Sequence, residues 1–206
     1  MVTDMKFILG RKENMVTFIG NDGLATAATL VAVGPAVITQ IKNKGTDGYE
    51  SVQIGFGTRA PKNISKAVQG HTKDLGSFAA IREFHVDDSS AWKKGDTLDA
   101  SLFTVGDEVT ISGTSKGKGF QGVVKRHGFH GGSRTHGQKH SEREPGSIGS
   151  TGQQKISKGR RMAGRMGSDR TTIKGLRVLG VDTTNNKILV SGCVPGIKGA
   201  LLEIKA

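Results

Sequence analysis

The sequence contains a single cysteine, Cys193, so the chain cannot form an internal disulfide framework. One thiol in 206 residues suits a reducing compartment such as the cytosol. Cys193 lies in the strand-like run ILVSGCV (188–194). We interpret it as a small apolar residue of that strand and not as a reactive thiol.

Long hydrophobic runs are also missing. The longest mainly apolar stretch, 30–38, is interrupted by Gly34 and Pro35, and it is far shorter than the roughly 20 residues that span a bilayer. The first residues do not combine a long apolar stretch with a small-residue cleavage site, so they do not resemble a secretory signal. We therefore expect a protein without membrane contact that is located in the cytoplasm.

Acidic residues are scarce in one part of the chain, residues 116–170, which we call the cationic segment. It holds 13 of the 30 Lys and Arg residues but only 3 of the 18 Asp and Glu residues, so it carries +10 of the total formal charge of +12. It also holds 13 of the 31 glycines. A glycine-rich, cationic segment in an otherwise nearly neutral chain indicates that it binds a polyanion.

The rest of the chain has the pattern of short strands separated by turn residues. Apolar and β-branched runs occur at 6–9, 15–19, 28–33, 36–41, 51–56, 78–86, 107–113, 175–182, 187–194 and 200–205. Residues 183–186 have the composition of a hairpin turn, and 62–70 are expected to form a short helix. This pattern predicts a mainly β fold with a barrel or sandwich. Residues 1–115 and 171–206 would form one discontinuous domain, with 116–170 inserted between two strands as a long, irregular arm.

The composition of the cationic segment favours RNA as its polyanion. Arginine pairs bidentately with phosphate, and glycine permits close approach of the backbone. Only two aromatic residues, Phe120 and Phe129, occur in the segment, which argues against a single-strand platform built mainly on base stacking. Contacts with the phosphates and sugars of folded, double-helical RNA fit better. The alternative, a solvated basic linker, would repel itself without a counter-charge.

Other chemistries match the residues poorly. GTSKGKG (113–119) has neither the spacing nor the Ser or Thr after lysine that a phosphate-binding loop needs. Two histidine pairs have spacings that could ligate zinc, but no cysteine lies nearby and the surrounding cations oppose metal binding. These pairs are His127 with His130, and His136 with His140. We therefore expect no catalytic residue, metal, cofactor or small-molecule substrate, and a protein that is not an enzyme.

Motifs along the whole chain resemble one known family, the universal large-subunit ribosomal protein L-three family in its bacterial-type form. In the cationic segment the similar motifs are SGTSKGKGFQGVVKRHGFHGG (112–132), THGQKH (135–140), PGSIG (145–149) and KGRRMAGRMG (158–167). Outside it they are ILGRKENMVTFIGNDG (8–23), DGYESVQIGFG (47–57) and ILVSGCVPGIKGALLEIK (188–205). The motifs occur in the order typical of the family, so the resemblance covers essentially the whole chain.

The resemblance implies a translation-protein-like β-barrel that binds large-subunit ribosomal RNA near its 3′ end and acts early in subunit assembly. The arm would extend toward the peptidyl-transferase region, and neighbouring large-subunit proteins would contact the barrel. The residues expected to bind ribosomal RNA are Lys116, Lys118, Lys125, Arg126, His127, Arg134, His136, Lys139, His140, Arg143, Lys155, Lys158, Arg160, Arg161, Arg165 and Arg170. The tip of the arm would consist of Pro145, Gly146, Ser147, Ile148, Gly149, Ser150, Thr151 and Gly152.

The sequence departs from the family pattern at two places. Asn14 stands where the family usually has glycine, and asparagine can also adopt a left-handed conformation, so we expect no loss of the fold. Some members methylate a glutamine just past PGSIG, where this chain has Gly152 followed by Gln153, which makes Gln153 the candidate for methylation. A function from a different class, a free RNA chaperone or regulatory RNA-binding protein, would need the same basic, glycine-rich arm.

Overall fold

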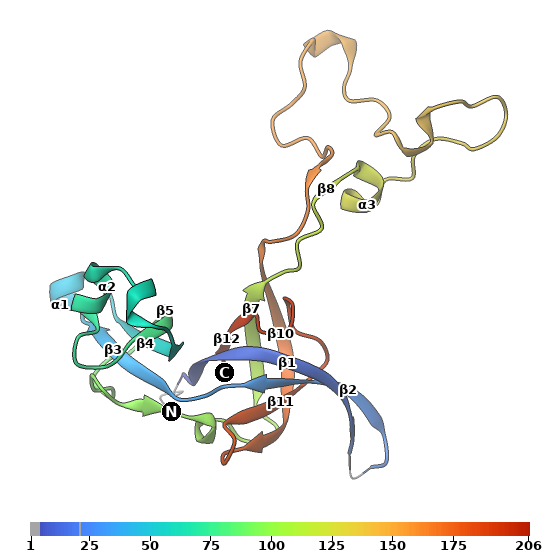
Figure 1. Ribbon diagram of the computed structural model, residues 1–206. Coiled ribbons are helices and arrows are strands. Elements are labelled where there is room, and N and C mark those ends of the chain that lie inside the picture. The colour runs from blue at the N-terminus through green and yellow to red at the C-terminus, as the bar shows by residue number, and fades with distance from the viewer. Residues whose placement is uncertain (1–4, 21) are drawn as a thin grey trace. The chain divides into compact units, whose positions relative to one another are not determined.

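The computed structural model describes residues 5–20 and 22–206, apart from the side chain of Gln153. The chain divides into two compact units (Figure 1). One unit, which we call the body, consists of Met1–Thr114 and Arg170–Ala206. The other, which we call the insertion, consists of Ser115–Asp169.

Six strands of the body close into an antiparallel barrel, in the order β1-β12-β7-β10-β11-β2 (Figure 1). Their bounds are β1 (Phe7–Ile19), β2 (Ala25–Ala32), β7 (Glu108–Thr114), β10 (Arg170–Asp182), β11 (Lys187–Ser191) and β12 (Leu201–Lys205). Full closure leaves no unpaired sheet edge around the ring. The mainly β fold with a barrel, predicted from the sequence, is confirmed.

Strand β1 is longer than the sequence pattern predicted, because the runs at 6–9 and 15–19 belong to one continuous strand. Its pairing with β2 shifts between Lys12 and Met15, which places an extra residue of β1 in a bulge. Asn14 lies in this bulge with a negative φ, so the left-handed conformation that the sequence allowed is not used.

Four other strands of the body form a second sheet that the sequence did not separate from the barrel. Its order is β5-β4-β3-β6, with bounds β3 (Ala36–Lys42), β4 (Ser51–Thr58), β5 (Phe78–His85) and β6 (Thr97–Leu98). The chain leaves the barrel at Gly34 and Pro35, where proline offers no N–H to a ladder. The expected helix at 62–70 is divided into η1 (Pro61–Asn63) and α2 (Lys66–His71), and α1 (Lys44–Asp47) and η2 (Ala100–Leu102) are equally short. None of the helices described is long and apolar enough to cross a lipid bilayer.

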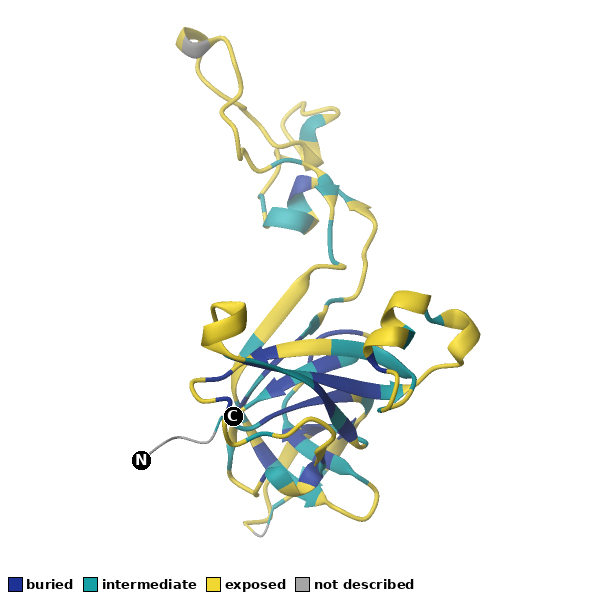
Figure 2. Ribbon diagram, turned by 90° about the vertical axis from the view of Figure 1, so that its left-hand side faces the viewer, coloured by how far each residue is buried: buried dark blue, intermediate teal, exposed yellow. Residues whose placement is uncertain are grey.

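Aromatic packing joins the barrel to the second sheet. The ring of Phe7, on β1, stacks on the ring of Phe84, on β5, with 4.9 Å between centroids. The ring of Trp92 also lies against Phe7, with 5.2 Å between the ring centroids. Phe7 and Phe84 are fully buried, and both belong to one hydrophobic core. Buried residues lie on strands of both sheets (Figure 2). The two sheets therefore share a single core.

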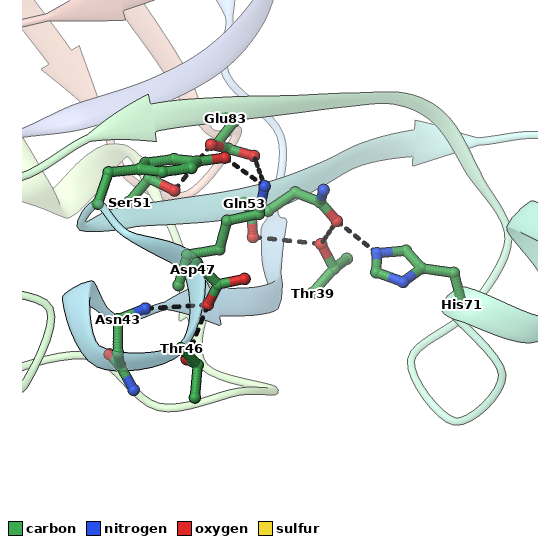
Figure 3. Close-up of polar contacts among 10 residues, drawn as sticks. Thr39, Asn43, Thr46, Asp47, Ser51, Gln53, His71 and Glu83 are labelled. Carbon is green, nitrogen blue, oxygen red and sulfur yellow. Dashed lines mark hydrogen bonds and ion pairs between the residues drawn. The ribbon is translucent and has the colours of Figure 1, made fainter.

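A polar network crosses one end of the second sheet (Figure 3). The Lys42 ammonium lies 3.0 Å from a Glu83 carboxylate oxygen and also hydrogen-bonds to the Tyr49 hydroxyl. Burial opposes ionisation of Glu83, but hydrogen bonds from Ser51 and Lys42 outweigh it and lower the pKa of this carboxyl group. Hydrogen bonding to Tyr49 and Glu83 raises the pKa of Lys42. The ammonium group of Lys42 is thus already paired within the body.

A second part of the network fastens helix α2 to the sheet (Figure 3). The side-chain oxygen of Gln53, on β4, accepts a hydrogen bond of 2.8 Å from the Thr39 hydroxyl. It lies 2.6 Å from Nε2 of His71, the last residue of α2. Because an amide oxygen only accepts, His71 must carry its proton on Nε2 and donate.

Truncation of the Phe84 ring should strongly lower the free energy of unfolding of the body. We expect Phe84→Ala to destabilise the body by about 3–5 kcal/mol, because it removes a fully buried ring and leaves a cavity. Phe120→Ala is the matched control, since Phe120 is exposed, and its effect should stay within about 0.5 kcal/mol. Urea-induced unfolding measures both free energies. Equal effects of the two substitutions would contradict the packing described above.

The lowered pKa of Asp107 should make the stability of the body sensitive to acid. Hydrogen bonds from the Lys6 ammonium, at 2.7 Å, and from the Thr104 backbone N–H lower the pKa of this carboxyl group to about 2, below its ordinary value of 3.8. A lowered pKa in the folded state stabilises the body above about pH 4. This contribution is lost as the pH falls toward 2.

We therefore expect Asp107→Asn to reduce the loss of stability between about pH 4 and pH 2. Urea-induced unfolding at a series of pH values measures this difference. Asp74→Asn is the matched control, because the exposed Asp74 side chain has no hydrogen bond or ion pair among the described residues. The same pH dependence in the Asp107 variant and in the unmodified chain would show that the lowered pKa of Asp107 contributes nothing to the acid sensitivity.

Candidate nucleic-acid interface

The insertion leaves and rejoins the body at neighbouring positions of one β ladder. Thr114, the last residue of β7, pairs with Arg170, the first residue of β10. Within the insertion, the N–H of Ser115 donates to the carbonyl of Asp169 over 2.9 Å. The two chain segments pair again at β8 (Phe120–Gln121) and β9 (Gly164–Arg165). Residues 115–121 and 164–169 thus form a two-stranded stem.

The stem depends on a glycine at position 167. Gly167 has a φ of +78°, and a Cβ atom there would lie 2.0 Å from the carbonyl oxygen of Lys116. Beside it, the N–H of Lys118 donates to the carbonyl of Met166, and the N–H of Met166 donates to the carbonyl of Gly119, each over 2.9 Å. A side chain at position 167 would force the two segments apart.

Helix α3 (Val123–His127) follows the stem and packs on the returning chain. Val123 is the only buried side chain of the insertion among the residues that the structure describes. Nη1 of Arg126 donates to the carbonyl of Met162 over 2.7 Å, and Nε2 of His127 lies 3.0 Å from the same oxygen. Arg126 and His127 are half-buried, and both side chains contact the insertion's own backbone.

The middle of the insertion is a loop closed by Glu142. The N–H of Gly132 donates to the Glu142 carbonyl over 3.1 Å, and the Glu142 carboxylate forms an ion pair with Arg134 at 2.7 Å. Gly131 has a φ of +77°, and a Cβ atom there would lie 1.9 Å from the Glu142 carbonyl oxygen. Glu142 itself lies in the 3-10 helix η3 (Ser141–Arg143). One of the predicted RNA-binding residues, Arg134, therefore has an acidic partner within the insertion.

The predicted tip, residues 145–152, is exposed along its whole length. The carbonyl of Ser147 accepts a hydrogen bond of 2.6 Å from Nη2 of Arg160, which ties the tip to the returning chain. The 3-10 helix η4 (Thr151–Gln153) ends the tip. The side chain of Gln153, the candidate for methylation, lies outside the described part of the structure.

A cavity of about 600 Å³ opens between helix α3, the Glu142 loop and the start of the tip. Its walls include His127, Phe129, His130, Glu144, Pro145 and Arg161. Within residues 5–20 and 22–206, no group of three or more His, Cys, Asp and Glu side chains is arranged to hold a metal ion. Of the two histidine pairs considered for zinc, His127 and His130 line this one cavity.

Most of the predicted RNA-binding side chains are exposed, the exceptions being the half-buried Arg126 and His127. Nine cations of the insertion form no side-chain hydrogen bond or ion pair with any described residue. They are Lys116, Lys118, Lys125, Lys139, Arg143, Lys155, Lys158, Arg161 and Arg165. The insertion has 12 Lys and Arg residues but only 3 acidic ones, so it has too few acidic residues to form an ion pair with each cation. Its surface is suited to a ligand that brings many negative charges.

The charges of the body are more nearly balanced than those of the insertion. It has 18 Lys and Arg residues and 15 acidic ones, and ion pairs connect Lys6 with Asp107, Lys42 with Glu83, and Lys187 with Glu13. Arg170, which the sequence assigned to the RNA-binding set, lies in β10 of the body, and its guanidinium contacts the Glu203 carboxylate. Arg82 contacts the same carboxylate. Arg170 thus differs from the nine unpaired cations of the insertion.

Comparison with known proteins is consistent with these features. The family model described as Ribosomal protein L3 matches residues 62–187. The large ribosomal subunit proteins uL3 of Herpetosiphon aurantiacus and Heliobacterium modesticaldum are each 45% identical to this chain. The matches cover 96% and 98% of this chain, and 94% and 96% of those proteins. The uL3 protein of Roseiflexus is 46% identical over 96% of this chain and 95% of its own length. The chain therefore belongs to the ribosomal protein L3 family, as its motifs predicted, and is a structural protein of translation and not an enzyme.

Proposed function

We propose that this chain is a component of the large ribosomal subunit that binds large-subunit ribosomal RNA through its insertion. The observation that carries the proposal is the set of nine exposed cations without a partner in the insertion. In the free chain these charges repel one another, whereas a phosphate backbone supplies the counter-charge and releases condensed ions when it binds. The body is more nearly balanced in charge, with 18 Lys and Arg residues and 15 acidic ones.

The finer parts of the proposal come from the resemblance to the family. Residues 116–170 would act as an arm, with residues 145–152 as the tip that approaches the peptidyl-transferase region. Binding would take place near the 3′ end of the large-subunit RNA and would help to start subunit assembly. The exposure of the tip and the absence of acidic residues within it support this assignment.

The proposed partners are the ribosomal RNA and neighbouring proteins of the large subunit, which would contact the body. The bacterial relatives favour a ribosome in the cytoplasm as the location. Gln153 remains the candidate for methylation, because it directly follows the tip. Of the proposed RNA-binding residues, Arg126 and His127 would act mainly by shaping the insertion, since both hold the Met162 carbonyl.

The salt dependence of binding tests the role of the insertion. If about six phosphates are neutralised, the logarithm of the affinity should fall with the logarithm of the salt concentration with a slope near −5. Replacing four unpaired cations of the insertion, Lys118, Lys125, Lys155 and Lys158, by glutamine should flatten this slope by about 3 to 4 units. Filter binding to purified large-subunit ribosomal RNA from 50 to 400 mM salt measures it.

A matched variant replaces four lysines of the body, Lys62, Lys66, Lys73 and Lys93, by glutamine. Its slope should change by less than half as much. Deleting the insertion and joining Thr114 to Arg170 through an Asn-Gly turn should leave a folded body with little salt-dependent binding, because these two residues are already cross-strand partners. Unchanged salt sensitivity in the deletion variant would refute RNA binding by the insertion.

Sedimentation separates the ribosomal proposal from a free RNA chaperone. We expect almost all of the chain in a cell lysate to sediment with large subunits and ribosomes, because assembly would remove it from the free pool. Crosslinking followed by sequencing should then recover large-subunit ribosomal RNA attached to residues 116–170. A large free pool, or crosslinks spread over many unrelated RNAs, would favour the chaperone instead.

A further inference from the structure

The stem carries an unusual side chain, an aromatic ring that nothing in the chain covers. Phe120 is 76% exposed, the highest value among the exposed large hydrophobic side chains that the structure describes. It is also one of only two aromatic residues in the insertion. From the sequence, Phe120 counted only as one of the two aromatic residues of the cationic segment, and it was not assigned as a contact residue.

Cross-strand pairing places a guanidinium beside this ring. Phe120 on β8 is the direct partner of Arg165 on β9. In an antiparallel pair, side chains directly opposite each other lie on the same face, about 5 Å apart at Cβ. Both side chains are exposed, and the Arg165 guanidinium has no hydrogen bond or ion pair with a described residue. The stem therefore presents an aromatic ring and an uncommitted guanidinium side by side.

The opposite face of the same two-stranded ladder is occupied. The next pair, Gln121 and Gly164, lies on that face. A Cβ atom on Gly164 would lie 2.7 Å from Nη1 of Arg126, which is itself fixed to the Met162 carbonyl. One face of the ladder is thus packed against Arg126, and the face with Phe120 and Arg165 is open.

The surroundings of the ring favour a nucleotide over an apolar protein surface. Residues 115–126 contain four cations and no acidic residue, and the aromatic ring is the only large exposed hydrophobic side chain among them. An apolar protein surface would have to desolvate these charges, whereas a nucleotide offers a flat base for the ring and a phosphate for the guanidinium. Every base has a π face that can stack on an aromatic side chain, and arginine pairs bidentately with phosphate.

We propose that Phe120 and Arg165 form a binding site for one unpaired nucleotide of RNA, whose base stacks on the Phe120 ring and whose phosphate pairs with the Arg165 guanidinium. The inference rests on the proposed RNA-binding function and adds to it a residue that acts without charge. A single stacking site is compatible with the scarcity of aromatic residues in the insertion. A base stacked at this one site would fix where the stem lies along the RNA. Phosphate contacts alone would not, because phosphates repeat along the whole backbone.

Substitutions in the full-length chain test the site through two different readouts. Phe120→Leu keeps an apolar side chain on the ladder but loses the ring, so the affinity for purified large-subunit ribosomal RNA should fall about tenfold with an unchanged salt slope. Arg165→Gln should instead flatten the salt slope by about one unit. Ile156→Ala is the matched control, because Ile156 is an exposed apolar residue of the insertion without a ring, and its effect should stay below about twofold.

A tryptophan variant reports stacking directly and covers the case in which the leucine variant disturbs the stem. Phe120→Trp should bind as tightly as the unmodified chain, and its added fluorescence, above that of Trp92, should be quenched when the RNA binds. If the unmodified chain binds the RNA but Phe120→Leu binds equally well and Phe120→Trp is not quenched, the site is refuted and the proposed function stands. If the unmodified chain does not bind large-subunit RNA, both fail.

Discussion

The pairing of β7 with β10 is the constraint on which the arrangement of the chain depends. It closes the barrel and also holds Thr114 and Arg170, which bracket the whole insertion, as cross-strand partners. Bringing the ends of a flexible loop of 55 residues together costs about 3.5 kcal/mol in chain entropy, apart from a constant term. The ladder and the Arg170–Glu203 ion pair offset this cost with contacts made entirely within the body.

The division of charge follows the division of structure. In the body, carboxylates such as Glu83, Asp107 and Glu203 accept ion pairs from nearby cations, and the hydrophobic core spans both sheets. The insertion has one buried side chain among its described residues, and Glu142 is its one acidic group in an ion pair there. The body is thus stabilised by its own contacts, whereas the insertion has 12 Lys and Arg residues and only 3 acidic ones.

Much of the fold could be predicted from the sequence, and the missed parts share a physical cause. Runs such as 51–56 predicted strands because alternation and β-branching are local signals. The run at 187–194 forms a strand only as far as Ser191, and Cys193, which was assigned to that strand, is exposed beyond its end. The separate second sheet, the β1 bulge and the pairing of Phe120 with Arg165 depend on which strands meet in space. Residues 120 and 165 are 45 positions apart, and no periodicity links them. Charge composition is a local signal, so the cationic segment could be recognised from the sequence, whereas the pairing of Phe120 with Arg165 could not.

The adjacency of Thr114 and Arg170 also makes the molecule modular. Because the body needs only that these two residues remain neighbours, the chain between them can change in length and sequence without altering the barrel's register. Under the proposed function, selection on the body would act through folding, whereas selection on most of the insertion would act through its fit to RNA. Gly131 and Gly167 are the exceptions, since a side chain at either would disrupt the insertion itself. Sequence changes in the body and in the insertion should therefore be limited by different requirements.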